Sequence, residues 1–147
     1  MSEYQITCCS TADMPAQYFE EKKIPFVCFN FLMDGVQYPD DLGKSMPFKE
    51  FYKKIADGAE PTTAQVNTQQ YMELFEPILQ KGLDILHLTL SSGISGSINS
   101  ANIAKVQMEE KYPGRKVRII DSLSASSGYG MLVDMALTKQ QEGLSLE

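Results

Sequence analysis

Apolar residues near the start of the chain recur in a pattern that predicts a strand, a helix and a hairpin. The apolar run Tyr4–Cys9 predicts a strand, and the Ser, Thr, Asp and Pro residues that follow it predict a capped helix reaching about Lys23. The stretch Ile24–Met33 is rich in Phe, Val and Cys, Asp34-Gly35 interrupts it, and Val36–Tyr38 resumes an extended pattern. This arrangement predicts a β-hairpin near residues 24–40.

The middle of the chain predicts two amphipathic helices with a polar loop between them. The first has apolar residues at spacings of three and four and ends near Asp57-Gly58; its stripe is Phe48, Phe51, Tyr52 and Ile55. Polar residues from Glu60 to Gln65 predict the loop. Asn67, with Gln70 three positions later, resembles a capping box at the start of the second helix, which Gly82 ends.

The remainder predicts strand, helix, strand and helix in turn. Leu83–Leu90 and Val117–Ile120 are the strands, and the long helix between them covers Ser97–Tyr112. The apolar positions that we expect to face the core on this helix are Ile98, Ala101, Ile103, Ala104 and Met108. A polar loop over residues 121–127 precedes a last helix at Met131–Gln141, terminated by Gly143.

Strands that alternate with helices of this length predict an α/β fold with a doubly wound, mostly parallel sheet flanked by helices. A length of 147 residues fits one domain. The chain stops soon after Gly143 without a further element, so we expect a domain taken from a longer protein.

The charge balance narrows the possible partners. A net charge of −6 opposes binding to the phosphate backbone, so we expect no nucleic acid partner. No apolar run is long enough for a transmembrane segment, and the first ten residues lack the layout of a secretory signal. Three cysteines, two of them adjacent in an apolar run, fit reduced thiols. These features predict a cytoplasmic location.

Hydroxyl side chains are concentrated behind two of the predicted strands. One cluster comprises Ser91, Ser92, Ser95, Ser97 and Ser100, and the other comprises Ser122, Ser124, Ser126 and Ser127. Ser10-Thr11 follows the first strand in the same way. In a parallel sheet such loops lie at the edge where ligands bind, and hydroxyls with free helix N–H groups can hold an anionic oxygen without a cation. Any single serine, and Ser100 in particular, is accounted for by capping or turn formation. The first cluster as a whole predicts a neutral cradle for a carboxylate or phosphate.

Other chemistries have weaker support. Residues 93–97 approach the hydrolase elbow but have Ser97 where its second glycine belongs, and the one histidine, His87, lies within a predicted strand. The glycines at 128 and 130 lack the third glycine of a dinucleotide fingerprint. The acidic pairs are adjacent rather than spaced as metal ligands. No cofactor or metal is therefore expected.

Five ordered motifs resemble those of the DegV family, the bacterial fatty-acid-binding group. The segment CSTADMP at residues 9–15 is similar to the family's D-S-T-A-D-L-P, and MDG at 33–35 precedes Tyr38 and an acidic pair. PTTAQ at 61–65 is similar to its T-S-Q segment, and LSSGISGS at 90–97 to L-S-S-x-x-S-G-T. DSLS at 121–124, followed by G-x-G, is similar to D-S-x-S. Cys9 replaces the family's usual aspartate, and Ala64 its serine.

This resemblance implies the amino-terminal domain of a two-domain protein, with the carboxy-terminal domain absent from this chain. It also implies a long-chain fatty acid in a tunnel, with hydroxyls holding the carboxylate. Carried over by position, Thr63 and Ser92 hydrogen-bond the carboxylate, while Ser91, Ser95 and Ser97 shape the loop. The resemblance further implies a carrier without catalysis of its own, which presents its ligand to a separate fatty acid kinase subunit.

Two alternatives stay open on the sequence. One is an acyl or phosphoryl transfer enzyme that uses a serine from residues 91–97. The other is a structural remnant whose sheet edge or apolar face a partner chain covers.

Overall fold

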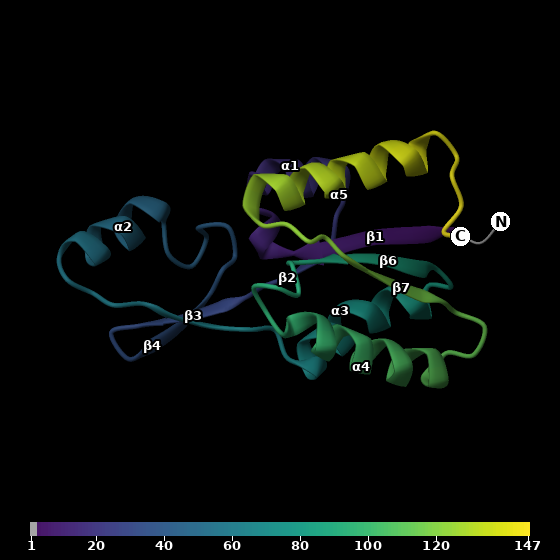
Figure 1. Ribbon diagram of the computed structural model, residues 1–147, viewed down its shortest axis with the longest axis horizontal. Helices are drawn as coiled ribbons and strands as arrows, with labels where there is room; N and C mark the ends of the chain where they lie inside the picture. Colours follow the sequence, from purple (N-terminus) through teal and green to yellow (C-terminus); the bar gives the residue numbers. More distant parts are fainter. Residues whose placement is uncertain (1–2) are drawn as a thin grey trace.

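Four parallel strands form the central sheet of the computed structural model, which describes residues 3–147. The strand order is β2-β1-β6-β7, with β1 at Tyr4–Cys9, β2 at Phe26–Val27, β6 at Asp84–Thr89 and β7 at Val117–Asp121. Helices cover both faces of this sheet (Figure 1). Helices α1 (Ala16–Lys22) and α5 (Ser126–Gln141) lie on one face, and α3 (Thr68–Gln80) and α4 (Ser97–Lys111) on the other. The predicted doubly wound α/β fold is confirmed.

A second, antiparallel sheet projects from the end of the first (Figure 1). Its order is β4-β3-β5, from Val36–Pro39, Asn30–Met33 and Thr62–Ala64, and helix α2 (Phe48–Ala56) connects β4 to β5. The predicted turn of the hairpin is confirmed, because Met33 pairs with Val36 across Asp34 and Gly35. Both turn residues have positive φ, 53° and 77°, which is the geometry of a tight two-residue hairpin turn.

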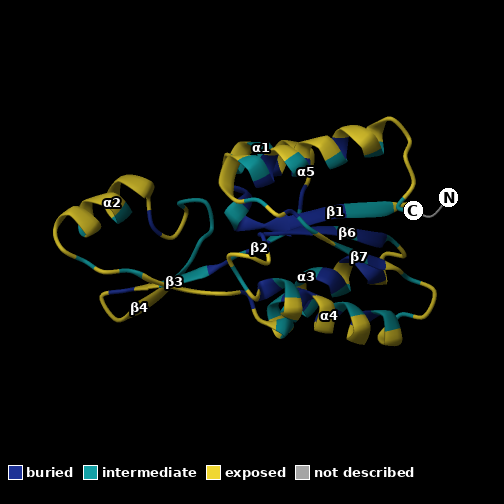
Figure 2. Cartoon of the chain, in the orientation of Figure 1, coloured by how far each residue is buried: buried dark blue, intermediate teal, exposed yellow. Residues whose placement is uncertain are grey.

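The core lies between the parallel sheet and its helices, where the burial colouring is darkest (Figure 2). The last four residues of β1 are buried, as are five of the six residues of β6. Strands buried on both faces are typical of a parallel sheet between two helical layers, because each face packs against a helix. The antiparallel sheet and α2 are mostly exposed in comparison (Figure 2).

The segment predicted as the first arm of the hairpin is divided between the two sheets. Phe26 and Val27 pair in parallel with Cys8 and Cys9 of β1, and the hairpin itself begins only at Asn30. The sequence did not predict this division, because the apolar run is continuous from one sheet to the other. In the structure, Val27 is buried in the core, whereas Asn30 begins the more exposed antiparallel sheet.

Two further predictions of element boundaries and one of burial are corrected. The polar loop at residues 60–65 contains strand β5, which is exposed and pairs through its backbone with β3. The last helix starts at Ser126 rather than Met131, because Gly128 and Gly130 are helical. Ile103, expected in the core, is 51% exposed, whereas Ala101, Ala104 and Met108 are buried. In contrast, the capping box of Asn67 and Gln70 is confirmed in both of its hydrogen bonds.

Within residues 3–147, no helix combines the length and apolar character that crossing a membrane demands.

Candidate functional site

The direction of chain winding reverses between the adjacent strands β1 and β6. From β1 the chain continues through α1 to β2 at one edge of the sheet, and from β6 it continues through α4 to β7 at the other edge. The two central strands are in register, with Thr7 opposite His87. In open α/β sheets ligands bind beyond the carboxyl ends of the strands at such a reversal. The turn after β1 and the loop after β6 therefore form one wall of the expected site.

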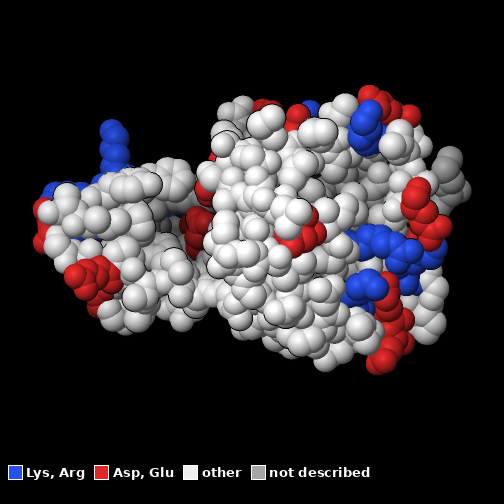
Figure 3. Space-filling view, viewed as in Figure 1, with Lys and Arg blue, Asp and Glu red and all other residues white. Residues whose placement is uncertain are grey.

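A cavity of about 680 Å³ lies beside this wall. Residues from the turn after β1 and the loop after β6 line one side, and residues of the antiparallel sheet and α2 line the other. Figure 3 shows the hollow between the projecting sheet and the body of the molecule. The volume is within the usual range of small-molecule sites, about 300–1,000 Å³.

Aromatic side chains form the apolar part of the cavity. Phe31 of β3 stacks on Tyr38 with ring centroids 5.4 Å apart and meets Phe51 of α2 edge-on at 5.2 Å. Phe29 and Met46 are buried beside them. Helix α2 buries none of its residues fully, so its aromatic stripe faces the cavity and solvent rather than a core.

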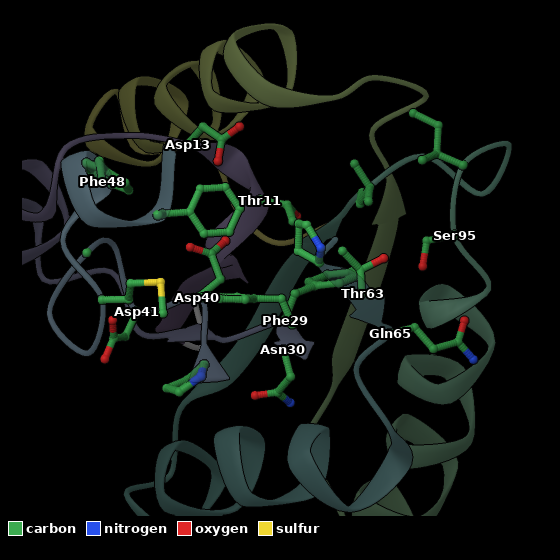
Figure 4. A pocket seen from close by; sticks show the side chains of 18 of the residues that line it. Thr11, Asp13, Phe29, Asn30, Asp40, Asp41, Phe48, Thr63, Gln65 and Ser95 are labelled. Carbon is green, nitrogen blue, oxygen red and sulfur yellow. The ribbon is translucent and has the colours of Figure 1, made fainter. Parts of the chain in front are cut away.

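Three Ser and Thr side chains line the cavity, each from a different segment. Thr11 comes from the 3₁₀ turn Ser10–Ala12 after β1, Thr63 from β5 and Ser95 from the loop before α4. Figure 4 shows these side chains together with Gln65. The Oγ of Ser95 accepts a hydrogen bond of 3.2 Å from the amide of Ser97, the first residue of α4. Two of the predicted site residues, Thr63 and Ser95, are therefore brought together at the cavity.

The other predicted serines are not among the residues that line this cavity within the described chain. The Oγ of Ser91 accepts a hydrogen bond of 3.1 Å from the amide of Gly93. Ser92 is exposed, and its amide donates a hydrogen bond of 3.1 Å to Asp121 Oδ1, with its side chain helping to hold the pKa of that carboxyl below its usual value. Ser97 is fully buried. The side chain of Ser91 thus forms a hydrogen bond within the loop, and the amide of Ser92 joins the loop to the end of β7.

Carboxylates occupy another part of the cavity wall. Asp13, Asp40 and Asp41 line it, and no Lys, Arg or His is among its lining residues in the described chain. Burial raises the pKa of Asp40, as do the nearby Asp13 and Asp41, although a hydrogen bond from Ser10 opposes the increase. Partial burial works against ionisation of Asp41 as well, but hydrogen bonds from Ser45 lower its pKa overall. The site is therefore acidic and apolar, with uncharged donors.

His87 lies in the core, where it cannot act as a base for Ser95. Its Nδ1 is 2.8 Å from Thr7 Oγ1, its Nε2 is 3.8 Å from Cys9 Sγ, and the ring is fully buried. Burial lowers its pKa to about 3. Burial likewise raises the pKa values of all three thiols, which disfavours the nucleophilic thiolate. Within residues 3–147 no cluster of three His, Cys, Asp or Glu side chains is placed to hold a metal ion.

Sequence reasoning missed much of the cavity wall. It did not assign the acidic side chains, Gln65 or the aromatic group from β3 and α2. Gln65 and the acidic pair at 40–41 stand within the motifs that carry the family resemblance, which was the available signal. The aromatic residues of α2 were predicted only as the apolar stripe of an amphipathic helix, and the folded structure places them beside a cavity.

Comparison with known proteins identifies the group to which these features belong. Residues 3–147 match the family model described as "Uncharacterised protein, DegV family". A DegV domain-containing protein of Clostridium perfringens is 33% identical over all 147 residues of the chain and 50% of its own length. The chain thus spans about half the length of the curated relatives it matches.

Solved structures with the same fold include fatty-acid-binding proteins. A stearic acid-binding protein from Eubacterium ventriosum has a TM-score of 0.89 and 27% identity, over 97% of this chain and 49% of its own. A fatty-acid-binding DegV family protein from Thermus thermophilus has a TM-score of 0.80 and 28% identity, over 99% and 50%. The Streptococcus pneumoniae fatty acid kinase B3 protein loaded with linoleic acid has a TM-score of 0.79 and 25% identity, over 97% and 50%. On the match over residues 3–147, the chain belongs to the DegV family.

Proposed function

We propose that this chain forms the amino-terminal half of a fatty acid carrier. It binds a long-chain fatty acid in the cavity of about 680 Å³, with the carboxylate on uncharged donors and the alkyl chain along the aromatic side chains. The proposal is carried by one observation, a cavity that combines an apolar wall with Ser and Thr hydroxyls from three separate segments. No cation is among its lining residues in the described chain. The fatty acids bound to the relatives from Eubacterium ventriosum and Streptococcus pneumoniae support the same ligand class.

The alkyl chain supplies most of the binding free energy in this proposal. Each buried methylene contributes about 0.8 kcal/mol, so the tail of a 16-carbon acid outweighs a few neutral hydrogen bonds. The chain spans about half the length of its relatives, so we propose that a second domain covers the rest of the alkyl chain of the fatty acid.

Uncharged donors suit a carboxylate that has to react afterwards. An arginine clamp would stabilise the negative charge of the carboxylate and so make the carboxylate a weaker nucleophile toward a phosphoryl group. Hydroxyl donors orient the carboxylate while stabilising its charge less. We therefore assign the chain a carrier role, with phosphorylation by a separate ATP-using fatty acid kinase subunit. The core position of His87, away from Ser95, supports this role over a serine enzyme.

Ligand identification tests the proposal directly. The purified chain is denatured after incubation with a 16-carbon fatty acid and removal of unbound lipid, and the released lipid is identified by mass spectrometry. A stoichiometric amount of fatty acid is expected, and an empty protein at saturating lipid contradicts the proposal. The loaded chain should form acyl phosphate from ATP only when a fatty acid kinase subunit is added.

The predicted donors are tested one at a time. Thr63→Val should weaken binding by about 1–3 kcal/mol, because a charged acceptor loses a buried donor. Ser92→Ala separates two positions of the carboxylate. If Ser92→Ala weakens binding more than Thr63→Val does, the carboxylate lies at the sheet edge near Asp121. If only Thr63→Val weakens binding, the carboxylate lies inside the cavity. Unchanged affinity in both variants would exclude the proposed pair of donors.

A further inference from the structure

One buried hydroxyl of a residue that lines the cavity has no hydrogen-bond partner. Within residues 3–147, two buried side-chain oxygen atoms lack any hydrogen bond, Thr11 Oγ1 and Ser97 Oγ. Thr11 lines the cavity, whereas Ser97 does not. A buried donor without an acceptor is costly, so an acceptor is expected in the space that it faces.

The neighbours of Thr11 are held in place by the fold. Ser10 accepts a hydrogen bond of 3.1 Å from the amide of Phe29, which ties the turn after β1 to the start of the antiparallel sheet. The amide of Asp13 donates to the Ser10 carbonyl over 3.0 Å and closes the turn. Thr11 lies between these two bonded residues, so its side chain is presented to the cavity by a backbone that is already fixed.

The position of Thr11 makes its hydroxyl useful to an anionic head-group. Thr11 lies at the carboxyl end of β1, beside β6 at the reversal of winding, where ligands of such sheets bind. Figure 4 shows it among Asp13, Asp40 and Thr63. The acidic side chains repel a carboxylate, so a carboxylate on this wall requires a donor there. The hydroxyl of Thr11 has no internal hydrogen bond and can supply one.

We infer that Thr11 is a ligand-binding residue, whose hydroxyl donates a hydrogen bond to the carboxylate of the bound fatty acid from the wall formed by the end of β1. This inference rests on the proposed function. It adds a donor from the first motif of the chain to Thr63, and it accounts for a hydroxyl that the folded protein leaves unsatisfied.

Two substitutions of different chemistry test the assignment. Thr11→Val keeps the shape of the side chain and removes the hydroxyl, and Thr11→Ser keeps the hydroxyl and removes a methyl group. Affinity for a 16-carbon saturated fatty acid is measured by titration calorimetry on the whole chain. We expect Thr11→Val to bind about tenfold more weakly, which corresponds to about 1.4 kcal/mol, and Thr11→Ser to bind nearly as the native chain does.

A spectroscopic measurement separates direct contact from a structural effect. With fatty acid labelled with ¹³C at the carboxyl carbon, Thr11→Val should raise the pKa of the bound carboxyl, because a donor to its charged form has gone. A change confined to packing would leave that pKa unchanged. Thr62→Val is the matched control, since Thr62 is an exposed threonine of β5 outside the cavity lining.

The possible results are distinguishable. If the native chain binds no fatty acid, the proposed function fails and the role of Thr11 fails with it. If the native chain binds and Thr11→Val matches it in affinity and in the pKa of the bound carboxyl, only the assignment of Thr11 is overturned. Such a result would mean that the hydroxyl of Thr11 does not contact the carboxylate.

Discussion

The amide of Cys9 donates a hydrogen bond of 2.9 Å to the phenol oxygen of Tyr129, 120 residues away in the chain. The same phenol donates to the carbonyl of Leu88. A single side chain from α5 thus joins the end of β1 to the end of β6, the two strands that flank the reversal of winding. The wall of the cavity is held by this bridge.

Removing the phenol hydroxyl should destabilise the fold. Tyr129→Phe leaves the amide of Cys9 and the carbonyl of Leu88 buried without this partner, and we expect the free energy of unfolding to fall by about 1–3 kcal/mol. Urea denaturation followed by circular dichroism measures the change. Tyr52→Phe is the control, because Tyr52 is 67% exposed and should tolerate the loss. Equal stability of Tyr129→Phe and the native chain would show that the bridge contributes little.

Gly130 allows α5 to approach the turn that carries Thr11. A Cβ at this position would lie 2.7 Å from the carbonyl oxygen of Ala12 and 2.9 Å from Met14 Sδ. The helix-forming advantage of alanine, about 1 kcal/mol, is smaller than the cost of a clash with backbone, about 1–3 kcal/mol. We expect Gly130→Ala to lower the urea midpoint and to weaken fatty acid binding as the turn is displaced.

A second glycine of the same helix provides the control. A Cβ at Gly128 would lie 2.5 Å from Ser124 Oγ, a side-chain atom that can rotate away. Gly128→Ala should therefore leave the chain as stable as the native protein or slightly more stable. A Gly130→Ala variant that behaves like Gly128→Ala would show that the turn after β1 can move without cost.

The core position of His87 makes stability depend on pH. Burial lowers its pKa to about 3, from an ordinary value of 6.5. Between these values the unfolded chain binds a proton that the folded chain does not bind, so this ring's contribution to stability is complete above pH 6.5 and is lost as pH falls. The loss reaches about 1.4 kcal/mol per pH unit.

Nuclear magnetic resonance can observe this ring without ambiguity, because the chain contains one histidine. We expect its ring resonances in the folded protein to stay constant from about pH 7.5 to 5, while those of the urea-unfolded chain titrate near the ordinary value. A midpoint near the ordinary value in the folded protein would contradict the burial of this residue.

The acidic wall should oppose an anionic ligand. Asp40→Asn removes one negative charge from the cavity lining while keeping the size of the side chain. We expect affinity for fatty acid at neutral pH to increase about two- to tenfold at low salt, and less at high salt, because salt screens charge repulsion. Asp34→Asn is the control, since Asp34 lies in the hairpin turn outside the cavity. Weaker binding by Asp40→Asn would mean that Asp40 contacts the ligand favourably.

Features that depend on a few neighbouring residues were determined by the sequence alone. The capping box of Asn67 and Gln70 and the turn at Asp34-Gly35 are hydrogen-bond or backbone patterns within four residues, so their residue types predict them. The alternation of apolar strands and amphipathic helices similarly predicted the parallel α/β fold. Motifs in the sequence also indicated the family, and two of the residues that they pointed to, Thr63 and Ser95, line the cavity.

Only the tertiary structure decided which side chains share the cavity. Strand β5 is polar and exposed, and it is a strand because the backbone of β3 pairs with it from 30 to 34 residues away. Ser92 lies against Asp121, 29 residues away, whereas Thr11 faces the cavity without a partner. These outcomes depend on hydrogen bonds and packing between segments that are distant in the sequence. The pattern along one segment does not specify them, because all serine and threonine hydroxyls have the same donor and acceptor capacity. Only the fold determines which group lies next to each hydroxyl.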